Sequence, residues 1–189
     1  MMGEGELRVN PATELGRIGR SAVFHPSRPS GTCARMDGRP TWDEYFMTIT
    51  REVAERSTCL RAKVGAVIVR ERSILATGYN GAPAGMPHCL DVGCEIYESR
   101  NPGGELVQNC FRTIHAEINA IAQAARRGTA IGEADIYVTH TPCVHCFKTI
   151  VNTGIRRVFY EKPYKLETIA ELRERAGVEL IQVAVSSKA

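Results

Sequence analysis

The alternation of hydrophobic and polar positions divides the chain into helices and strands from about residue 41 onward. Thr41 and Glu44 have the spacing of a capping box, and apolar residues then recur at helical intervals to about Ser57. Two apolar runs rich in β-branched residues follow at 64–69 and 74–77. The polar residues between these runs favour a hairpin turn, so the pattern predicts a helix followed by two paired strands.

The second half of the chain alternates strands with helices. A helical pattern runs from Ile114 to a C-terminal cap at Gly128. A second helix is predicted to open with Thr141 as N-cap and Pro142 as its first residue. The further elements are strands at 135–139, 155–160 and 178–185 and a helix at 166–176. This order predicts an α/β fold with three α/β/α layers and a mixed sheet of about five strands.

Two irregular stretches interrupt this alternation. The loop 78–85 is rich in glycine and follows the second strand, at a place where an open sheet binds ligands. Asn80 in this loop is therefore a candidate to bind a sugar or a base, although an ordinary turn is the alternative. Residues 86–113 show no regular period and are too long for a simple connection, so they need some other means of support.

Residues 1–40 differ in character from the rest of the chain. They are rich in Gly, Pro, Ser and Arg and show no sustained periodicity. We interpret them as a flexible N-terminal extension of a single domain at 41–189. Met36 offers an alternative start, in which case the residues before it would not belong to the protein.

Composition and charge limit the classes of function. The chain is 43% hydrophobic, as in an ordinary globular domain, and no apolar run reaches the roughly 18 residues of a membrane span. The N-terminus lacks the apolar core of a signal peptide, so a cytoplasmic location is expected. The net charge is +3, and residues 1–40 hold six basic and four acidic side chains, which leaves the domain near +1. Extended nucleic-acid binding is therefore disfavoured, whereas one nucleotide phosphate needs only one or two cations.

Two short motifs combine into one candidate metal site. His115-Ala116-Glu117 and Pro142-Cys143-Val144-His145-Cys146 each stand at a predicted helix start. Cys143 and Cys146 lie three residues apart on one helical face, and the helix start favours their thiolate forms. With His115 they would supply three ligands and leave one position open, which is the arrangement of a catalytic zinc ion. The odd total of seven cysteines also fits metal ligation better than disulfides.

Glu117 is the candidate for proton transfer. It stands two residues after His115 and outside the ligand set, and the two motifs together are the signature of zinc-dependent nucleobase deaminases. The alternative is a closed structural zinc site, with His145 or a distant cysteine as the fourth ligand. His145 is predicted to point away from the face that carries the two cysteines, so we interpret the site as catalytic.

A second, structural zinc site is predicted from the remaining cysteines. Its ligands would be four of five residues, namely Cys59 just before the first predicted strand and His88, Cys89, Cys94 and Cys110 within the irregular stretch. A zinc ion would give this stretch the rigidity that burial does not supply. The alternative is that these cysteines are buried thiols without a metal.

The same motifs carry a resemblance to a known family. Between about Arg39 and Tyr164 the chain resembles the cytidine deaminase-like superfamily and, within it, the deoxycytidylate (dCMP) deaminases, including bacterial members linked to competence operons. The two zinc motifs identify the superfamily. The loop Gly78-Tyr79-Asn80-Gly81, with Cys59 and Lys63-Val64-Gly65-Ala66 upstream of it, is more particular to dCMP deaminases.

The resemblance implies a cytidine deaminase-like fold and the hydrolysis of dCMP to dUMP and ammonia, a reaction that feeds thymidylate synthesis. It implies that His115, Cys143 and Cys146 hold the catalytic zinc and that Glu117 shuttles protons. Related enzymes are typically homohexamers that dCTP activates and dTTP inhibits. Arg126 falls where family members place a phosphate-sensing arginine.

Substrate contacts are expected from three residues. The resemblance places Asn80 at the sugar and Tyr164 beside the substrate, and the backbone N–H of Ala116 is suited to reading the base. A phosphate requires cations, and those next to the motifs are Arg61, Lys63 and Arg112.

The resemblance also supports a second zinc ion near the substrate loop. The positions that match its ligands in related enzymes are Cys59 and Cys89, with Cys110 near a third. The histidines that often complete that site in relatives, just upstream of the catalytic histidine, have no counterpart here.

Two other interpretations of the zinc motifs stay open. One is another zinc deaminase of the superfamily, acting on a tRNA adenosine, a free base, a nucleoside or a riboflavin precursor. The near-neutral domain disfavours a tRNA substrate, and the loop 78–85 disfavours the others. The second is a zinc-stabilised binding module without activity, which would not need Glu117.

Overall fold

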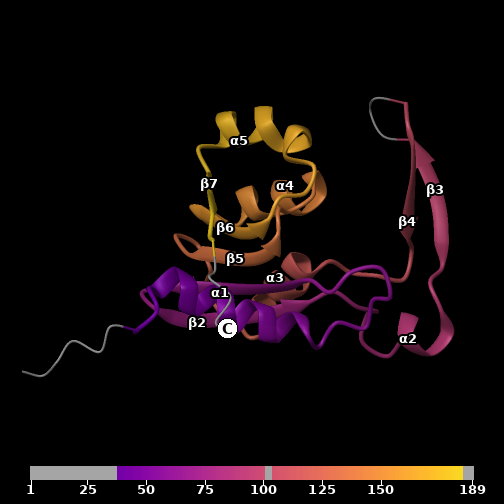
Figure 1. The fold of residues 1–189 in the computed structure, drawn as a ribbon, viewed down its shortest axis with the longest axis horizontal. Coiled ribbons are helices and arrows are strands. Elements are labelled where there is room, and N and C mark those ends of the chain that lie inside the picture. Colours follow the sequence, from indigo (N-terminus) through magenta and orange to yellow (C-terminus); the bar gives the residue numbers. More distant parts are fainter. Residues whose placement is uncertain (1–37, 101–103, 185–189) are drawn as a thin grey trace, which may run out of the picture. The chain divides into compact units, whose positions relative to one another are not determined.

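The computed structural model describes residues 38–100 and 104–184, so the predicted extension lies outside the described residues except for its last three positions (Figure 1). The helices are α1 (Trp42–Ala54), α2 (Cys89–Val92), α3 (Ala116–Arg126), α4 (Val144–Asn152) and α5 (Ala170–Ala176), with a 3₁₀ turn η1 (Leu166–Ile169). The strands are β1 (Gly65–Arg70), β2 (Ser73–Tyr79), β3 (Ile96–Arg100), β4 (Leu106–Cys110), β5 (Asp135–His140), β6 (Arg157–Lys162) and β7 (Glu179–Gln182). No helix in this part of the chain is long and apolar enough to cross a bilayer.

Five strands form one mixed sheet in the order β2-β1-β5-β6-β7. β1 is antiparallel to β2 and β5, whereas β5, β6 and β7 run parallel. On one face, Phe46 of α1 packs with Tyr137. On the other face, Ala120 of α3 and Phe147 of α4 belong to the same core cluster as Ile136. The predicted three-layer α/β/α fold with a mixed five-stranded sheet is confirmed.

Two predicted helix boundaries are also confirmed. The Thr41 hydroxyl accepts a hydrogen bond from the backbone N–H of Glu44 at 3.2 Å, and the Glu44 carboxylate accepts one from the Thr41 N–H at 2.7 Å. This capping box starts α1. Gly128 follows α3 with a φ of 66°, the left-handed conformation expected of a glycine at a helix end.

The start of α4 differs from the prediction by two residues. Cys143, not Thr141, is the N-cap. The hydroxyl of Thr141 instead accepts a hydrogen bond from the backbone N–H of Tyr164 at 3.3 Å, and the backbone N–H of Thr141 donates to the carbonyl of Lys162 at 2.9 Å. Thr141 therefore ties the loop before α4 to the end of β6, and Cys143 takes the capping position.

Two glycines let a helix approach each face of the sheet closely. A Cβ on Gly65 of β1 would lie 2.2 Å from the carbonyl oxygen of Thr50 in α1. A Cβ on Gly78 of β2 would lie 2.3 Å from the carbonyl oxygen of Ala116 and 2.3 Å from the backbone nitrogen of Ala120. Because α3 begins at the histidine motif, Gly78 determines how closely that motif approaches the sheet edge.

The stretch 86–113 contains a short helix and a two-stranded hairpin that periodicity did not predict. β3 pairs antiparallel with β4, from Ile96 opposite Cys110 to Arg100 opposite Leu106. The two strands contact mainly each other rather than the five-stranded sheet. Most of their residues are exposed, so the strands lack the alternation of apolar and polar residues that reveals a half-buried strand.

Candidate active site

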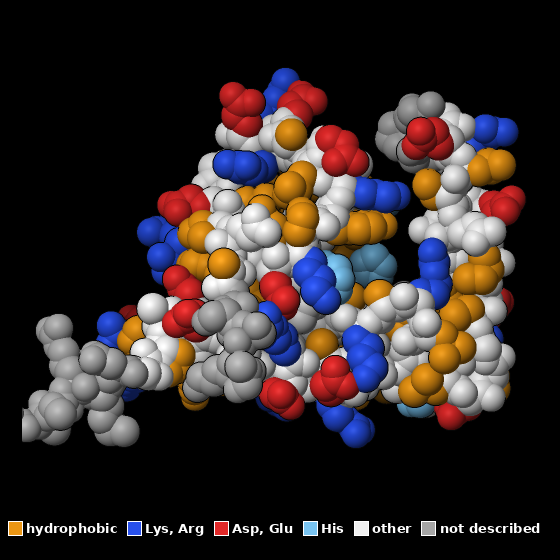
Figure 2. Space-filling model, in the orientation of Figure 1, with side chains coloured by type: hydrophobic (Ala, Val, Ile, Leu, Met, Phe, Trp, Pro, Cys, Tyr) orange, Lys and Arg blue, Asp and Glu red, His pale blue; other side chains and the backbone are white. Residues whose placement is uncertain are grey.

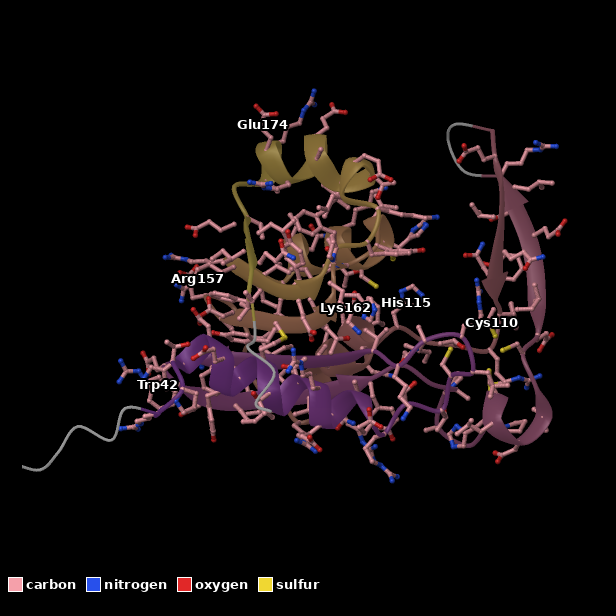
Figure 3. The ribbon with its side chains drawn as sticks, viewed as in Figure 1. Trp42, Cys110, His115, Arg157, Lys162 and Glu174 are labelled. Atoms are coloured by element: carbon pink, nitrogen blue, oxygen red, sulfur yellow. The ribbon has the colours of Figure 1, made fainter. Side chains whose placement is uncertain are left out.

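The starts of two helices bring three metal-binding side chains together. His115 is the N-cap of α3, Cys143 is the N-cap of α4, and Cys146 lies in the first turn of α4. The Nδ1 of His115 lies 3.5 Å from the Sγ of Cys143 and 3.3 Å from the Sγ of Cys146. Figure 3 shows the position of His115. Paired backbone hydrogen bonds between Gly81 and Ile114, of 3.1 and 2.8 Å, hold the start of α3 against the loop after β2.

Hydrogen bonds within this cluster shift the pKa values of its members. The interaction with the Cys146 thiol lowers the pKa of Cys143 to about 3, while the same interaction and burial raise the pKa of Cys146. The interaction with Cys143 raises the pKa of His115. The sulfur of Cys143 thus favours the thiolate form, and this charge stabilises the protonated form of the neighbouring imidazole. Two sulfurs and an imidazole nitrogen at helix starts match the donor set that zinc prefers.

The cluster has three ligands and no more within the described ranges 38–100 and 104–184. No other histidine, cysteine or acidic residue there brings a donor atom into the group. His145 is exposed and lies outside it. The closed four-ligand site considered from the sequence is therefore not supported, and a fourth coordination position is available to water or to a substrate.

Glu117 lies in the first turn of α3, immediately after His115 and Ala116. Its side chain is only 4% exposed, and burial raises the pKa of its carboxyl group. The carboxyl group also hydrogen-bonds to the thiol of Cys146. A buried carboxyl group beside the metal ligands, with a pKa displaced toward neutral pH, is suited to accept and return protons.

Asn80, predicted to bind the sugar, is 5% exposed and holds the segment before β1 in place. Its Oδ1 accepts hydrogen bonds from the hydroxyl of Ser57 at 2.6 Å and from the backbone N–H of Val64 at 2.9 Å. Its Nδ2 donates to the carbonyl of Ala62 at 2.8 Å. One amide N–H remains for a ligand. The sugar contact stays a prediction, and Asn80 has a structural role that the sequence did not reveal.

A second cluster joins three of the five residues predicted for a structural zinc. The sulfurs of Cys89, Cys94 and Cys110 lie within 4.8 Å of one another. Cys59 and His88 are not in this group. The Sγ of Cys59 accepts a hydrogen bond from a backbone N–H two residues later, and the Nδ1 of His88 lies 3.1 Å from a threonine hydroxyl. Thr58, which precedes Cys59, contacts the ring of His88, so neither the Cys59 sulfur nor the His88 ring joins the three sulfurs.

Hydrogen-bond donors surround the sulfur of Cys110 and make this cluster suitable for a cation. Burial raises the pKa of Cys110, but hydrogen bonds from the Thr113 hydroxyl and from the backbone of Arg112 and Glu95 bring it down to about 7. Such donors stabilise a thiolate, the form of cysteine that binds metal ions. The cluster lies where α2, β3 and β4 meet, so a bound ion would fasten the base of the hairpin.

The cations predicted to bind a phosphate already have partners. Arg61 donates a hydrogen bond to the carbonyl of Gln108. Lys63 forms an ion pair with the carboxylate of Glu55, and Arg112 forms one with the carboxylate of Glu95. The Nε of Arg112 is buried and has no hydrogen-bond partner in the described part of the chain. A phosphate would have to compete for these side chains, and their role stays a prediction.

Arg126 and Tyr164, the two other predicted residues, lie at different distances from the metal ligands. Arg126 is the last residue of α3, roughly 15 Å along the helix from its start at 1.5 Å per residue. Tyr164 follows β6, is 46% exposed, and lies under the Lys165 ammonium at 5.5 Å from the ring centroid. Tyr164 thus remains near the loop that leads into α4, whereas Arg126 lies away from the metal ligands.

Sequence reasoning missed two basic residues at the sheet edge. His140 and Lys162 are the last residues of β5 and β6 and face each other in the register of these parallel strands. The sequence feature that could have identified them is a basic residue at the carboxyl end of each predicted strand. That signal becomes informative only when the strands are known to be neighbours.

Comparison with known proteins places these motifs in a family. The family described as the cytidine and deoxycytidylate deaminase zinc-binding region matches residues 40–162. ComE operon protein 2 of Bacillus subtilis is 46% identical over 146 residues, which cover 77% of this chain and 72% of that protein. The deoxycytidylate deaminase of Schizosaccharomyces pombe is 38% identical over 145 residues, which cover 76% of this chain but only 44% of the yeast protein.

A solved structure agrees with these sequence relatives. The crystal structure of the dCMP deaminase from the cyanophage S-TIM5, in complex with dCMP and dUMP, has a TM-score of 0.63 and 31% sequence identity. The similarity covers 77% of this chain and 99% of the cyanophage chain. The family match at 40–162 includes both motifs of the three-ligand cluster. The chain therefore belongs to the zinc-binding cytidine and deoxycytidylate deaminase family.

Proposed function

We propose that the protein is a zinc-dependent hydrolase that deaminates dCMP to dUMP and releases ammonia. The observation that carries this proposal is the open three-ligand cluster of His115, Cys143 and Cys146 with the buried carboxyl group of Glu117 beside it. Relatives named deoxycytidylate deaminase, and the neighbouring structure with dCMP and dUMP, support the choice of substrate. The supply of dUMP for thymidylate synthesis is part of the same proposal.

The proposed chemistry uses the metal ligands for binding and Glu117 for proton transfer. A zinc ion held by the cluster would act as a Lewis acid and lower the pKa of a bound water molecule to about 7, as in other zinc enzymes. Glu117 accepts a proton from the attacking water as its oxygen adds to C4 of cytosine. Glu117 then delivers this proton to N3. It takes a second proton from the new hydroxyl on C4 and passes it to the amino group, which leaves as ammonia while C4 becomes a carbonyl.

The remaining substrate contacts are proposed from position. The N–H of Ala116 lies at the start of α3, where helix geometry provides no acceptor within the helix. It is next to the metal ligand His115 and is suited to read the base. Asn80 would offer its remaining N–H to the sugar, and the exposed ring of Tyr164 would lie beside the base or sugar. These contacts fix the ring in the orientation that attack at C4 requires.

Regulation and assembly are proposed from the family resemblance alone. Activation by dCTP, inhibition by dTTP and a homohexamer are the expected properties. Arg126 is exposed at the end of α3, where a neighbouring copy or a nucleotide bound between copies has access to it.

The proposed substrate predicts strong discrimination for the phosphate. We expect kcat/KM for dCMP to exceed that for deoxycytidine by about 10³, because a site that pairs polar groups with a substrate rejects the analogue that lacks them. Initial rates with dCMP, CMP, deoxycytidine and dCTP, measured with and without dCTP as activator, test this. Equal values for dCMP and deoxycytidine, or preferential deamination of a tRNA anticodon loop, would assign the chain to another activity of the superfamily.

The second cluster predicts a second zinc ion. We expect the purified protein to hold two zinc ions per chain and C94S to hold one, with a melting temperature lowered by roughly 5 °C or more. C59S is the matched control, because Cys59 is not in the group of three sulfurs, and it should retain both ions. Metal analysis of active protein that finds one zinc per chain would refute the structural site. Loss of one ion from C59S would instead make Cys59 its fourth ligand.

A further inference from the structure

A polar cavity of about 490 Å³ lies between the end of α1 and the carboxyl ends of β5 and β6. Its charged or titratable lining residues are Arg51, Glu55, Lys63, His140, Glu161 and Lys162, and Figure 3 shows the position of Lys162. The cavity is on the α1 side of the sheet, whereas α3 and α4, which carry the three metal ligands, pack on the opposite face. It is therefore a site distinct from the metal cluster, at the same edge of the sheet.

Both carboxylates in this cavity are already neutralised by partners. Arg51 binds Glu161 through two hydrogen bonds, of 2.8 and 2.9 Å, and this pairing lowers the pKa of Glu161. Lys63 pairs with Glu55. Lys162 is the lining cation for which the described residues provide no ion pair. The cavity thus carries one more positive charge than negative charges, with His140 counted as neutral.

His140 and Lys162 are held side by side by the strand register. His140 of β5 lies opposite Lys162 of β6, and the bond between the Thr141 N–H and the Lys162 carbonyl fixes the strands just beyond this pair. Burial and the nearby Lys162 charge lower the pKa of His140, while its Nδ1 lies 3.1 Å from the Thr139 hydroxyl. Ligands of open α/β sheets bind at the carboxyl ends of neighbouring strands, and these two residues stand there.

We propose that this cavity binds a phosphate group through Lys162 and His140. A phosphate would supply the negative charge that Lys162 lacks, and the imidazole would serve as a second donor on the next strand. The phosphate could belong to the dCMP substrate itself or to a separate phosphorylated molecule.

The binding test uses the zinc-loaded full chain and inorganic phosphate as the probe. Phosphate should move the imidazole NMR signal of His140, which H140N identifies among the five histidines. K162Q should weaken phosphate binding about tenfold or more, the effect of losing one charge-assisted contact. K148Q is the matched control, because Lys148 is exposed on α4 and outside the cavity, and it should bind as the wild type does. An unmoved His140 signal, or equal affinity of K162Q and wild type, would overturn the proposal.

Enzyme kinetics distinguish a phosphate supplied by dCMP from one supplied by a separate molecule. This part of the test alone rests on the proposed function. If the substrate supplies the phosphate, K162Q should raise KM for dCMP about tenfold and leave kcat/KM for deoxycytidine unchanged. If a separate molecule supplies it, K162Q should leave KM and kcat for dCMP unchanged and should abolish the change in rate that inorganic phosphate causes in the wild type. Failure of the deaminase proposal would remove this part but leave the phosphate titration as a complete test.

Discussion

Replacing Glu117 by Gln should abolish deamination while the fold and the zinc content stay unchanged. The amide has the shape of the carboxyl group and fits the same buried space, but it cannot accept a proton from water and deliver it to the base. Loss of general acid–base catalysis lowers kcat by roughly 10²–10⁴ or more. Initial rates with dCMP, together with zinc analysis and thermal melting, measure the three expectations.

A matched exchange on the surface controls for this result. Figure 2 shows acidic and basic side chains over α5. Glu174 on this helix is exposed, and E174Q makes the same chemical change away from the metal cluster (Figure 3). It should turn over dCMP at the wild-type rate. Turnover by E117Q within about tenfold of wild type would show that another group transfers the proton, because a shuttle contributes at least about a hundredfold.

Replacing Gly78 by Ala should destabilise the domain and weaken zinc binding. The added Cβ would lie 2.3 Å from two backbone atoms of α3, the carbonyl oxygen of Ala116 and the nitrogen of Ala120. Backbone cannot move aside as a flexible side chain can, so the start of α3 and His115 would have to shift. Overpacking of this kind costs about 3 kcal/mol. Thermal melting and zinc content are the measurements.

Gly38 provides the control for the Gly78 exchange. A Cβ on Gly38 would meet nothing within 4 Å, so G38A should leave both measurements unchanged. If G78A melted within about 2 °C of wild type with full zinc, a shift too small for a cost of several kcal/mol, the close approach of α3 to β2 would not be important for the site.

The sequence predicted the parts of the molecule that local chemistry determines. The capping box of Thr41 and Glu44, the apolar strands and the location of His115 and Cys143 near helix starts follow from neighbouring residues, although α4 begins two residues later than predicted. The metal triad could be predicted because its donor types and spacing restrict the possible chemistry. The prediction that the His115 motif and the cysteine motif lie together depended on the expected α/β fold. The observed order of the strands makes that proximity possible.

The rest depends on contacts between distant segments, which spacing does not encode. Cys59 was a candidate for the second zinc, yet the sulfurs that converge are those of α2, β4 and the segment between α2 and β3. The amide of Asn80 is largely used by the 57–64 segment, and only the structure shows this. Lys162 and His140 became a pair only once β5 and β6 were seen as parallel neighbours.

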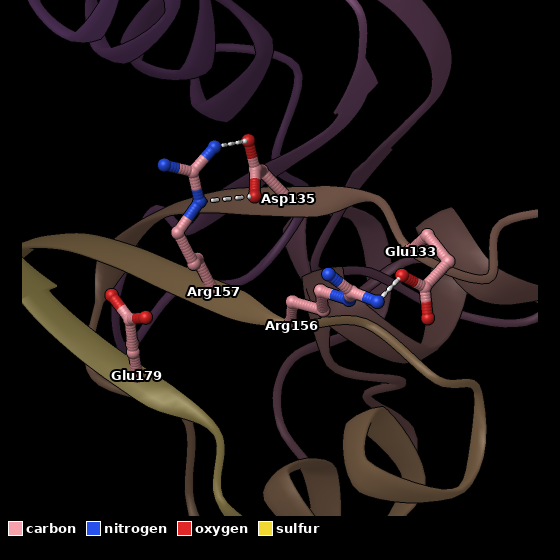
Figure 4. A pocket seen from close by; sticks show the side chains of 5 residues that line it. All are labelled: Glu133, Asp135, Arg156, Arg157 and Glu179. Atoms are coloured by element: carbon pink, nitrogen blue, oxygen red, sulfur yellow. Dashed lines mark hydrogen bonds and ion pairs between the residues drawn. The ribbon is translucent and has the colours of Figure 1, made fainter.

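The amino-terminal ends of β5, β6 and β7, opposite the end that carries His140 and Lys162, show why charge alone does not indicate a site. A pocket there is lined by Glu133, Asp135, Arg156, Arg157 and Glu179 (Figure 4). Arg157 binds Asp135 through two hydrogen bonds, of 2.7 and 2.6 Å, and Arg156 pairs with Glu133. Both arginines of this pocket are thus paired with carboxylates. We interpret them as surface ion pairs between neighbouring segments rather than as a ligand site.

The most direct test of the central claim is the reaction of the zinc-loaded protein with dCMP. The loss of cytosine absorbance should be accompanied by dUMP and ammonia in equal amounts. Chelation of the zinc should stop the reaction, and added zinc should restore it. Protein that holds zinc at the His115 cluster but forms neither dUMP nor ammonia from dCMP would contradict the account.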